Sequence, residues 1–287
     1  MDRFRSILRI ARSYSNFASP DEGPIHQERG IENEGTSPVH QPPVLVERGE
    51  DDSILIIVFT GGAQRLMLPA YEFLETTEIL GYSRILLRDP YHKRYHRGID
   101  RQRRSFRRLV AYLQDEIARL NPNKVVCVGT SSGGYAAIRA GHRLRADYVH
   151  AFAPQTGARS TIRSKPRGRY RFWPWRSALI RRAGAPVDLR RILRKSNGKT
   201  TYYIHYGRGH TKDRFHAEHI SGLPGVVTLG YPCETHRIAV FLAKTGFLKE
   251  SLVLASQDRL PALARERFPK SLEINAPRRD PAGGCCG

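Results

Sequence analysis

The stretch KVVCVGTSSGGYAAIRAG, residues 124–141, decides the fold. An apolar run at 125–128 meets Gly-Thr-Ser-Ser-Gly-Gly at 129–134, and an alanine-rich helical pattern follows at once. A sharp turn from strand to helix strains the backbone at its tip, so the residues two before and two after the tip must be small. Gly129 and Gly133 meet this requirement around Ser131, which predicts a nucleophilic serine. The alternative is a glycine-rich turn that binds phosphate or only packs closely.

Further apolar segments surround this turn on both sides. They lie at 54–59, 84–88, 148–152, 201–206 and 225–229. Short, continuous apolar runs are typical of a parallel sheet covered on both faces. Helical patterns alternate with them, most clearly at 103–120. The sequence therefore predicts an α/β fold with a doubly wound, mostly parallel sheet.

The ends of the chain differ in composition from its centre. We expect a basic amphipathic N-terminus and disordered linker at 1–50, one domain at 51–250, and a C-terminal helix and tail at 251–287. The strongly basic interval at 159–199 is too long for a simple crossover, so a cap insertion is expected there. The N-terminal helix is either a solvated helix, a membrane-surface helix or an organelle presequence. The Cys285-Cys286 pair matches no prenylation signal and stays unassigned.

Charge and composition limit the partners of the protein. The 287 residues carry 48 Lys plus Arg against 27 Asp plus Glu, a formal net charge of +21. This excess favours an anionic substrate or an anionic membrane surface. Nucleic acid is not favoured, because the signatures of RNA-binding modules with interleaved aromatic residues are missing. Without an apolar run of ~18–20 residues, and with cysteines that form no disulfide framework, a cytoplasmic protein is expected, with peripheral membrane contact as the alternative.

A nucleophilic serine needs a base, and the base needs an orienting acid. In a fold of this type the chain order is nucleophile, acid, histidine. Asp213 falls in the predicted loop after the segment at 201–206, and His236 follows the segment at 225–229. The sequence therefore predicts a triad of Ser131, Asp213 and His236. Glu218 is the alternative acid, and Asp213 is then a helix cap.

The oxyanion of an acyl-transfer reaction needs two backbone donors. One is expected from the amide of Ser132, directly after the nucleophile. The other is expected from the loop FTGGAQ at 59–64, where paired glycines let the backbone approach a ligand closely. We assign it to the amide of Gly62 or Ala63.

Several blocks together resemble the α/β-hydrolase superfamily. FTGGAQ, RDPYHKRYHRG, GTSSGGYAA, AFAPQTG and YGRGHTKDRFHAEH are similar to segments of a little-characterised bacterial branch that carries R-D-P and F-x-P-Q-T blocks. The resemblance covers roughly residues 53–248 and is more specific than the serine turn alone. It implies the α/β-hydrolase fold and the triad of Ser131, Asp213 and His236. It implies no particular substrate.

Two further groups of residues are candidates for binding. Arg97 and Tyr95 follow the segment at 84–88 and are expected at the mouth of the site, where either would hold an anionic group. The alternative is a solvated basic loop. Trp173 belongs to the aromatic residues of the basic insertion, which would line an acyl or sugar pocket. Histidines also gather around Asp213, namely His205, His210, His216, His219 and His236. They lack the H-E-x-x-H form, so neither a metal nor a cofactor is expected.

The sequence thus predicts a serine hydrolase that cleaves an ester or thioester through an acyl-enzyme. The substrate is a small-molecule or saccharide ester, and an anionic one fits the charge. The same residues would also serve an O-acyltransferase or esterase acting on polysaccharide. From another class, the chain could be a basic membrane- or nucleic-acid-binding module with a vestigial triad.

Overall fold

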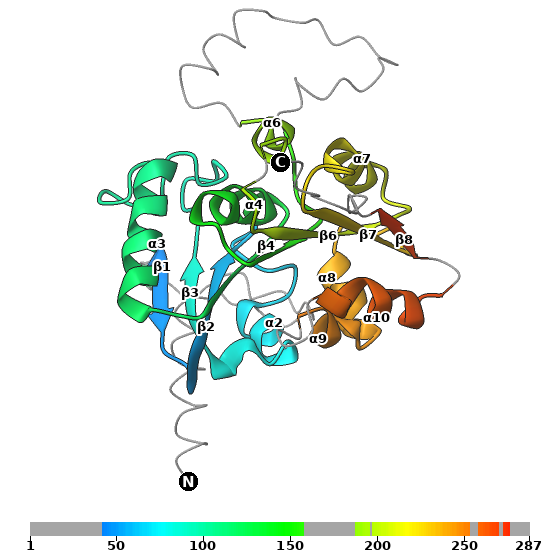
Figure 1. Ribbon diagram of the computed structural model, residues 1–287, viewed down its shortest axis with the longest axis horizontal. Coiled ribbons are helices and arrows are strands. Elements are labelled where there is room, and N and C mark those ends of the chain that lie inside the picture. The colour runs from blue at the N-terminus through cyan, green and yellow to red at the C-terminus, as the bar shows by residue number, and fades with distance from the viewer. Residues whose placement is uncertain (1–41, 158–186, 196, 253–257, 270–271, 276–287) are drawn as a thin grey trace, which may run out of the picture.

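A single sheet organises the molecule. The computed structural model describes residues 42–157, 187–195, 197–252, 258–269 and 272–275. The eight strands lie in the order β1-β3-β2-β4-β5-β6-β7-β8, as Figure 1 shows. The strands are β1 (Val44–Glu47), β2 (Asp51–Phe59), β3 (Tyr82–Leu87), β4 (Lys124–Thr130), β5 (Tyr148–Phe152), β6 (Thr201–Gly207), β7 (Val226–Tyr231) and β8 (Glu273–Asn275). The six central strands are parallel, and β1 and β8 join the two edges antiparallel.

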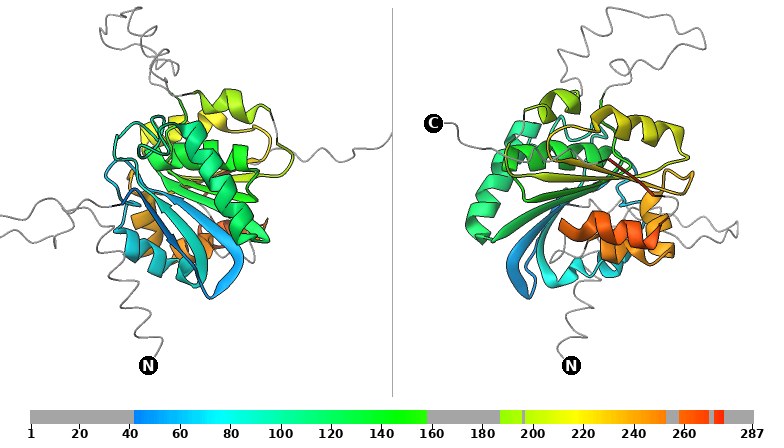
Figure 2. Two further views of the ribbon diagram at one scale, coloured as in Figure 1. Left: turned by 90° about the vertical axis from the view of Figure 1, so that its left-hand side faces the viewer. Right: turned by 45° about the vertical axis from the view of Figure 1, so that its right-hand side comes forward.

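Helices cover both faces of this sheet. One face carries α3 (Phe106–Leu120), α4 (Ser132–Leu144), α6 (Leu189–Leu193) and α7 (Thr211–Ile220). The other carries α2 (Ala70–Thr76), the short 3-10 helix η1 (Ile79–Gly81), α8 (Ile238–Lys244), α9 (Phe247–Ser251) and α10 (Leu260–Arg267). The two helical layers with the sheet between them are plain in Figures 1 and 2. The predicted doubly wound α/β architecture is confirmed.

Alternate residues of the central strands enter opposite cores. On β2, Leu55, Ile57 and Phe59 pack with the first helical layer, whereas Ile56 and Val58 pack with the second. All five side chains are fully buried. Because both faces of the strand are covered, each position has to be apolar. This explains why the strands stand out in the sequence as continuous apolar runs.

The edges of the sheet differ from the expectation. Strand β1 lies inside the segment at 1–50 that was assigned to a linker, and β8 lies inside the segment at 251–287 that was assigned to a helix and tail. Both strands are short, with four and three residues, so their patterns give little signal. Glu47 of β1 pairs with the buried Arg84 of β3 at 2.7 Å, which fastens the edge. The sheet therefore extends past residues 51 and 250 at both ends.

Two helices that the sequence predicts are present, and the start of one of them is explained by its cap. Helix α3 begins at Phe106 rather than at 103, because the side chain of Ser105 accepts a hydrogen bond of 3.2 Å from the amide of Arg108. The C-terminal helix predicted around Leu260 is present as α10.

Three of the predicted features fall on residues that the structure does not describe. The N-terminal helix, the basic part of the insertion with Trp173, and Cys285 and Cys286 lie outside the described residues. Cys127 is buried in β4, where burial raises the pKa of its thiol. None of the helices in the described ranges is both long and apolar enough to cross a membrane.

Candidate active site

The turn between β4 and α4 has the strained geometry that the sequence predicts. Ser131 has φ 51° and ψ −113°, a conformation that is rare for a residue with a side chain. A Cβ on Gly129 would lie 2.4 Å from the carbonyl oxygen of Gly133. A Cβ on Gly133 would lie 2.2 Å from the carbonyl oxygen of Phe59. Only glycine fits at these two positions. The two glycines let the backbone make the sharp turn that has Ser131 at its tip.

The structure brings Ser131, His236 and Asp213 together from three separate segments. Nε2 of His236 lies 3.2 Å from Oγ of Ser131. Nδ1 of His236 lies 2.9 Å from each carboxylate oxygen of Asp213. The Asp213 side chain is only 4% exposed, whereas that of His236 is 41% exposed. The acid is therefore enclosed while the base remains open to a substrate.

These contacts fix the tautomer of the histidine. A carboxylate accepts hydrogen bonds and cannot donate them, so Nδ1 of His236 carries a hydrogen. In the neutral ring the lone pair is then on Nε2, facing the serine hydroxyl. This is the form in which an imidazole takes a proton from serine.

Asp213 and the alternative acid, Glu218, lie on different sides of helix α7, one buried and the other exposed. Asp213 lies in the first turn of α7 and not in a loop, because α7 begins at Thr211, directly after His210. Glu218 is exposed and forms an ion pair of 2.7 Å with Arg214. The alternative acid is therefore engaged by Arg214, whereas Asp213 is the carboxylate in contact with His236.

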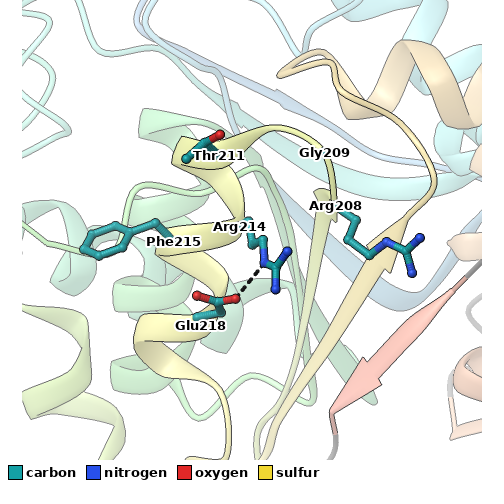
Figure 3. Close-up of a pocket in the computed structure, with 6 residues that line it drawn as sticks. All are labelled: Arg208, Gly209, Thr211, Arg214, Phe215 and Glu218. Atoms are coloured by element: carbon teal, nitrogen blue, oxygen red, sulfur yellow. Dashed lines mark hydrogen bonds and ion pairs between the residues drawn. The ribbon is translucent and has the colours of Figure 1, made fainter. Parts of the chain in front are cut away.

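A pocket of about 450 Å³ lies against α7 and the loop that precedes it. Figure 3 shows its lining, with the Arg214 and Glu218 side chains joined by their ion pair. The lining residues are Arg208, Gly209, Thr211, Arg214, Phe215 and Glu218. Ser131, Asp213 and His236 are not among them, so this pocket is separate from the serine.

The loop after β2 lies against the serine turn, as the oxyanion prediction requires. A Cβ on Gly61 would be 3.0 Å from Oγ1 of Thr130, and one on Gly62 would be 3.6 Å from Oγ of Ser132. The amide of Gly61 bonds to the carbonyl oxygen of Arg65 at 2.8 Å. Gly62 and Ala63 are exposed, and no backbone acceptor is recorded for their amides within the described residues. Their assignment to an oxyanion hole, with Ser132, stays a prediction.

The segment after β3 places its residues differently from the expectation. Tyr95 is fully buried, and its hydroxyl donates to the carbonyl oxygens of Leu87 and Thr60 at 2.8 and 3.1 Å. It therefore ties the ends of β2 and β3 together and has no surface for a substrate, which corrects its assignment as a binding residue. Its amide bonds to the buried Asp89 at 2.9 Å, so the R-D-P block shapes the loop. Arg97 is exposed, with its guanidinium 5.8 Å from the ring centre of Tyr91.

The F-x-P-Q-T block connects the serine turn to α7. The amide of Gln155 donates to the carbonyl oxygen of Ser131 at 3.3 Å. The amide of Thr156 donates to Nδ1 of His216 on α7 at 3.2 Å. Burial, as the largest influence, lowers the pKa of His216 to about 4, so this ring is neutral near pH 7. The role of His216 was not predicted, since only the folded chain brings it to Thr156.

The clustered histidines separate into different environments. His205 is buried and hydrogen-bonded to His150 and Tyr231 at 3.2 and 3.0 Å. His219 pairs with Asp188 at 2.8 Å. His210 joins His236 at Asp213, and the three residues offer ligand atoms within 4.8 Å of one another. That arrangement is also the one expected of hydrogen-bonded imidazoles around a carboxylate, so the absence of a metal stays a prediction.

Comparison with known proteins finds similarity in structure. No protein-family model and no curated protein sequence matches the chain. Solved structures that resemble it include MenH from S. aureus, with 14% identity, a TM-score of 0.48 and coverage of 72% of this chain and 98% of that one. An alpha-beta serine hydrolase homologue from Coxiella burnetii has 13% identity, a TM-score of 0.44 and coverage of 73% and 91%. The capsule O-acetyltransferase of Neisseria meningitidis serogroup A has 17% identity, a TM-score of 0.42 and coverage of 61% and 74%.

At these identities the likeness concerns the fold alone. The fold can be named from the chain's own architecture, since a mostly parallel sheet covered by helices on both faces, with a serine on the sharp turn between β4 and α4, is that of the α/β-hydrolase fold. The chain has this fold. The narrower similarity to a branch with R-D-P and F-x-P-Q-T blocks stays a prediction.

Proposed function

We propose that the protein is a serine hydrolase that cleaves an ester or thioester through an acyl-enzyme. One observation carries the proposal: Oγ of Ser131 lies 3.2 Å from Nε2 of His236, whose other nitrogen lies 2.9 Å from both oxygens of the enclosed Asp213. This is the relation between nucleophile, base and acid that acyl transfer to serine requires. The strained backbone of Ser131 adds support, because such strain is commonly stored at functional sites.

The proposed reaction has two halves. His236 accepts the hydroxyl proton of Ser131 as Oγ bonds to the substrate's carbonyl carbon, and Asp213 stabilises the resulting imidazolium. The tetrahedral intermediate collapses, and the leaving alcohol or thiol takes the proton from Nε2. Water then attacks the acyl-enzyme, with His236 accepting its proton, and the acid is released as Ser131 regains its hydrogen.

Negative charge on the carbonyl oxygen would be held by backbone amides. The amide of Ser132 is at the first position of α4, where the first amides of a helix have no partner within the helix. Their aligned dipoles favour negative charge. The amide of Gly62 or Ala63, in the loop beside Ser132, would supply the second donor.

Exposed cations support an anionic substrate. Strands β3 and β4 are both parallel to β2, so their carboxyl ends lie at the same edge of the sheet. The loop that leads from β3 to α3 begins at this edge, and Ser131 follows β4 there. Exposed cationic side chains in this region are Lys93, Arg97, Arg101, Arg104, Arg107 and Arg108. Of the two carboxylates between residues 88 and 108, Asp89 is buried and Asp100 is paired with Arg103. A positive potential near the mouth of the site would draw in a negatively charged ester.

The test is labelling with a fluorophosphonate, which reacts with activated serines. We expect the wild-type protein to be labelled and Ser131→Ala not to be labelled, with hydrolysis of at least one acyl ester in a panel of short and long chains. Equal labelling of both proteins contradicts the assignment. Absence of labelling together with salt-sensitive binding to anionic vesicles or nucleic acid would instead support a binding module with a vestigial triad. Acyl transfer to an added oligosaccharide, faster than hydrolysis, would identify an O-acyltransferase.

A further inference from the structure

The carboxylate of Asp213 faces a second imidazole besides that of His236. Nδ1 of His210 lies 2.9 Å from Oδ2 of Asp213. The two histidine rings flank the acid with their centres 5.5 Å apart. From this geometry we propose that His210 is a positioning residue: it holds the carboxylate of Asp213 in place for His236 by a second hydrogen bond. The inference rests on the proposed function.

The hydrogen on His210 can be placed by electrostatics. A lone pair on Nδ1 would repel a carboxylate oxygen at 2.9 Å, so Nδ1 carries the hydrogen and donates it to Asp213. The amide of Asp213 also lies 3.3 Å from this nitrogen, at the first turn of α7. The same amide has a carbonyl partner, that of His210, at 3.0 Å. His210 is the N-cap of α7, but the amide of Asp213 does not depend on its side chain alone, because the main-chain carbonyl of His210 accepts from the same amide.

The second hydrogen bond distinguishes the two oxygens of Asp213. Nδ1 of His236 is 2.9 Å from both of them, so this contact by itself selects neither. His210 occupies Oδ2, which leaves Oδ1 as the preferred acceptor for His236. It also limits rotation of the carboxylate, whose side chain is only 4% exposed and has little contact with water. His210 thereby fixes the direction in which the base is held.

Loss of this second hydrogen bond should leave the carboxylate of Asp213 freer to rotate. His236 is then held less firmly, and kcat falls. A side chain that restores the donor should recover the rate, whereas it would not do so if the role of His210 were purely structural.

The kinetic test compares three variants. His210→Ser keeps a residue that caps helices well but is too short to reach the carboxylate. His210→Asn keeps both a cap and a donor near the position of Nδ1. His219→Gln is the matched control, a histidine on the same helix that pairs with Asp188 and does not contact Asp213.

We expect a loss of roughly 10- to 100-fold in kcat/KM for His210→Ser, as for a buried hydrogen bond to a charged group. His210→Asn regains most of the activity, and His219→Gln stays near wild type. An unchanged rate in a folded His210→Ser protein overturns the proposal. So does an equal loss in His219→Gln, or a His210→Asn protein no more active than His210→Ser.

A second measurement does not depend on turnover. In the wild-type protein with ¹⁵N-labelled imidazoles, NMR should show His210 and His236 both as Nδ1–H tautomers, and Asp213→Asn should displace both signals. His210 found as the Nε2–H tautomer overturns the proposal. If both signals are present while Ser131 resists the fluorophosphonate, the hydrogen bond is supported and the proposed hydrolase function alone fails.

Discussion

Nδ1 of His92 lies 2.9 Å from the carbonyl oxygen of Gly62. Because that oxygen can only accept, the nitrogen carries the hydrogen and His92 donates. In a trans peptide the carbonyl and the following amide point in opposite directions. The contact therefore sets the direction of the Ala63 amide, one of the two candidates for the second oxyanion donor.

Replacement of His92 tests this relationship. We expect His92→Ala to lower kcat by roughly tenfold, somewhat less than the loss of an oxyanion donor itself, since the peptide is loosened and not removed. KM should change little, because the oxyanion forms only in the transition state. Steady-state kinetics on the best ester of the panel gives both values. Gln102→Ala, an exposed residue of the same loop, is the control, and a comparable fall in that variant would contradict the role of His92.

The serine turn should tolerate no side chain at its second glycine. A Cβ on Gly133 would lie 2.2 Å from the carbonyl oxygen of Phe59, a backbone atom that cannot move aside. Gly133→Ala should therefore lower the free energy of unfolding by about 1–3 kcal/mol, as overpacking does. Gly62→Ala is the control, because its Cβ would meet only Oγ of Ser132 at an ordinary 3.6 Å. Urea denaturation of both variants decides, and equal stabilities would show that the turn can relax.

The two carboxylates of α7 should respond differently to loss of charge. Asp213→Asn should lower turnover by roughly 10²- to 10⁴-fold, because the tautomer and orientation of His236 are lost. Glu218→Gln should stay near wild type, since Glu218 is exposed and paired with Arg214. Single-turnover hydrolysis, with circular dichroism as a check on the fold, makes the comparison. A collapse in Glu218→Gln with normal activity in Asp213→Asn would transfer the role of the acid.

The exposed cations near the site should select for substrate charge. Changing Lys93, Arg97 and Arg101 to Gln should raise KM for anionic esters, leave neutral esters nearly unchanged and flatten the salt dependence. A matched control changes Lys244, Arg259 and Arg265, in or beside the helices α8 and α10 of the opposite layer, and removes the same charge. If both ester classes respond alike in the first variant, the cations have no part in selection.

A buried histidine should make the stability depend on pH. Burial, with a smaller effect of His150, lowers the pKa of His205 well below its ordinary value. The folded protein therefore keeps His205 neutral, whereas the unfolded chain gains a proton below pH ~6.5. Stability is fully present above that pH and falls below it, by up to about 1.4 kcal/mol per pH unit for this group.

Unfolding experiments at pH 7.5 and pH 5 measure this effect. Wild type should lose stability between the two conditions, and His205→Phe should lose less, even though it gives up the hydrogen bond to Tyr231. His142→Phe provides the comparison, because His142 is only partly buried on α4. The same decline in wild type and His205→Phe would show that other groups carry the pH dependence.

The serine turn and the central strands could be predicted because their physical requirements are local. Gly129 and Gly133 have to be glycine because a Cβ there would clash with main-chain atoms a few residues away or on the adjoining strand. A strand that is buried on both faces has to be apolar throughout. The edge strands β1 and β8 could not be predicted in the same way. They are short, and their antiparallel partners lie far away in the sequence.

The errors around the candidate site have a common physical cause. The sequence predicts a loop at Asp213, because nothing in it shows that His210 ends the preceding loop and starts α7. It predicts substrate contact for Tyr95, because a position just after a strand is typical of binding residues. In the structure the left-handed backbone of Tyr95, with φ 61°, turns its side chain into the core. The contacts of His210 and His92 depend on which loops meet in space, and residue spacing does not contain that information.

The nucleophile is positioned by main-chain atoms and the acid by side-chain atoms, so the two differ in how substitutions around them act. Ser131 is held by main-chain oxygens packed against Gly129 and Gly133, and main-chain atoms are the same whatever residues surround them. Asp213 is held by the side chains of His210 and His236, which mutation can replace. Substitutions around the acid can therefore change which side chains support Asp213. At the serine turn, no change in the surrounding side chains removes the need for the two glycines.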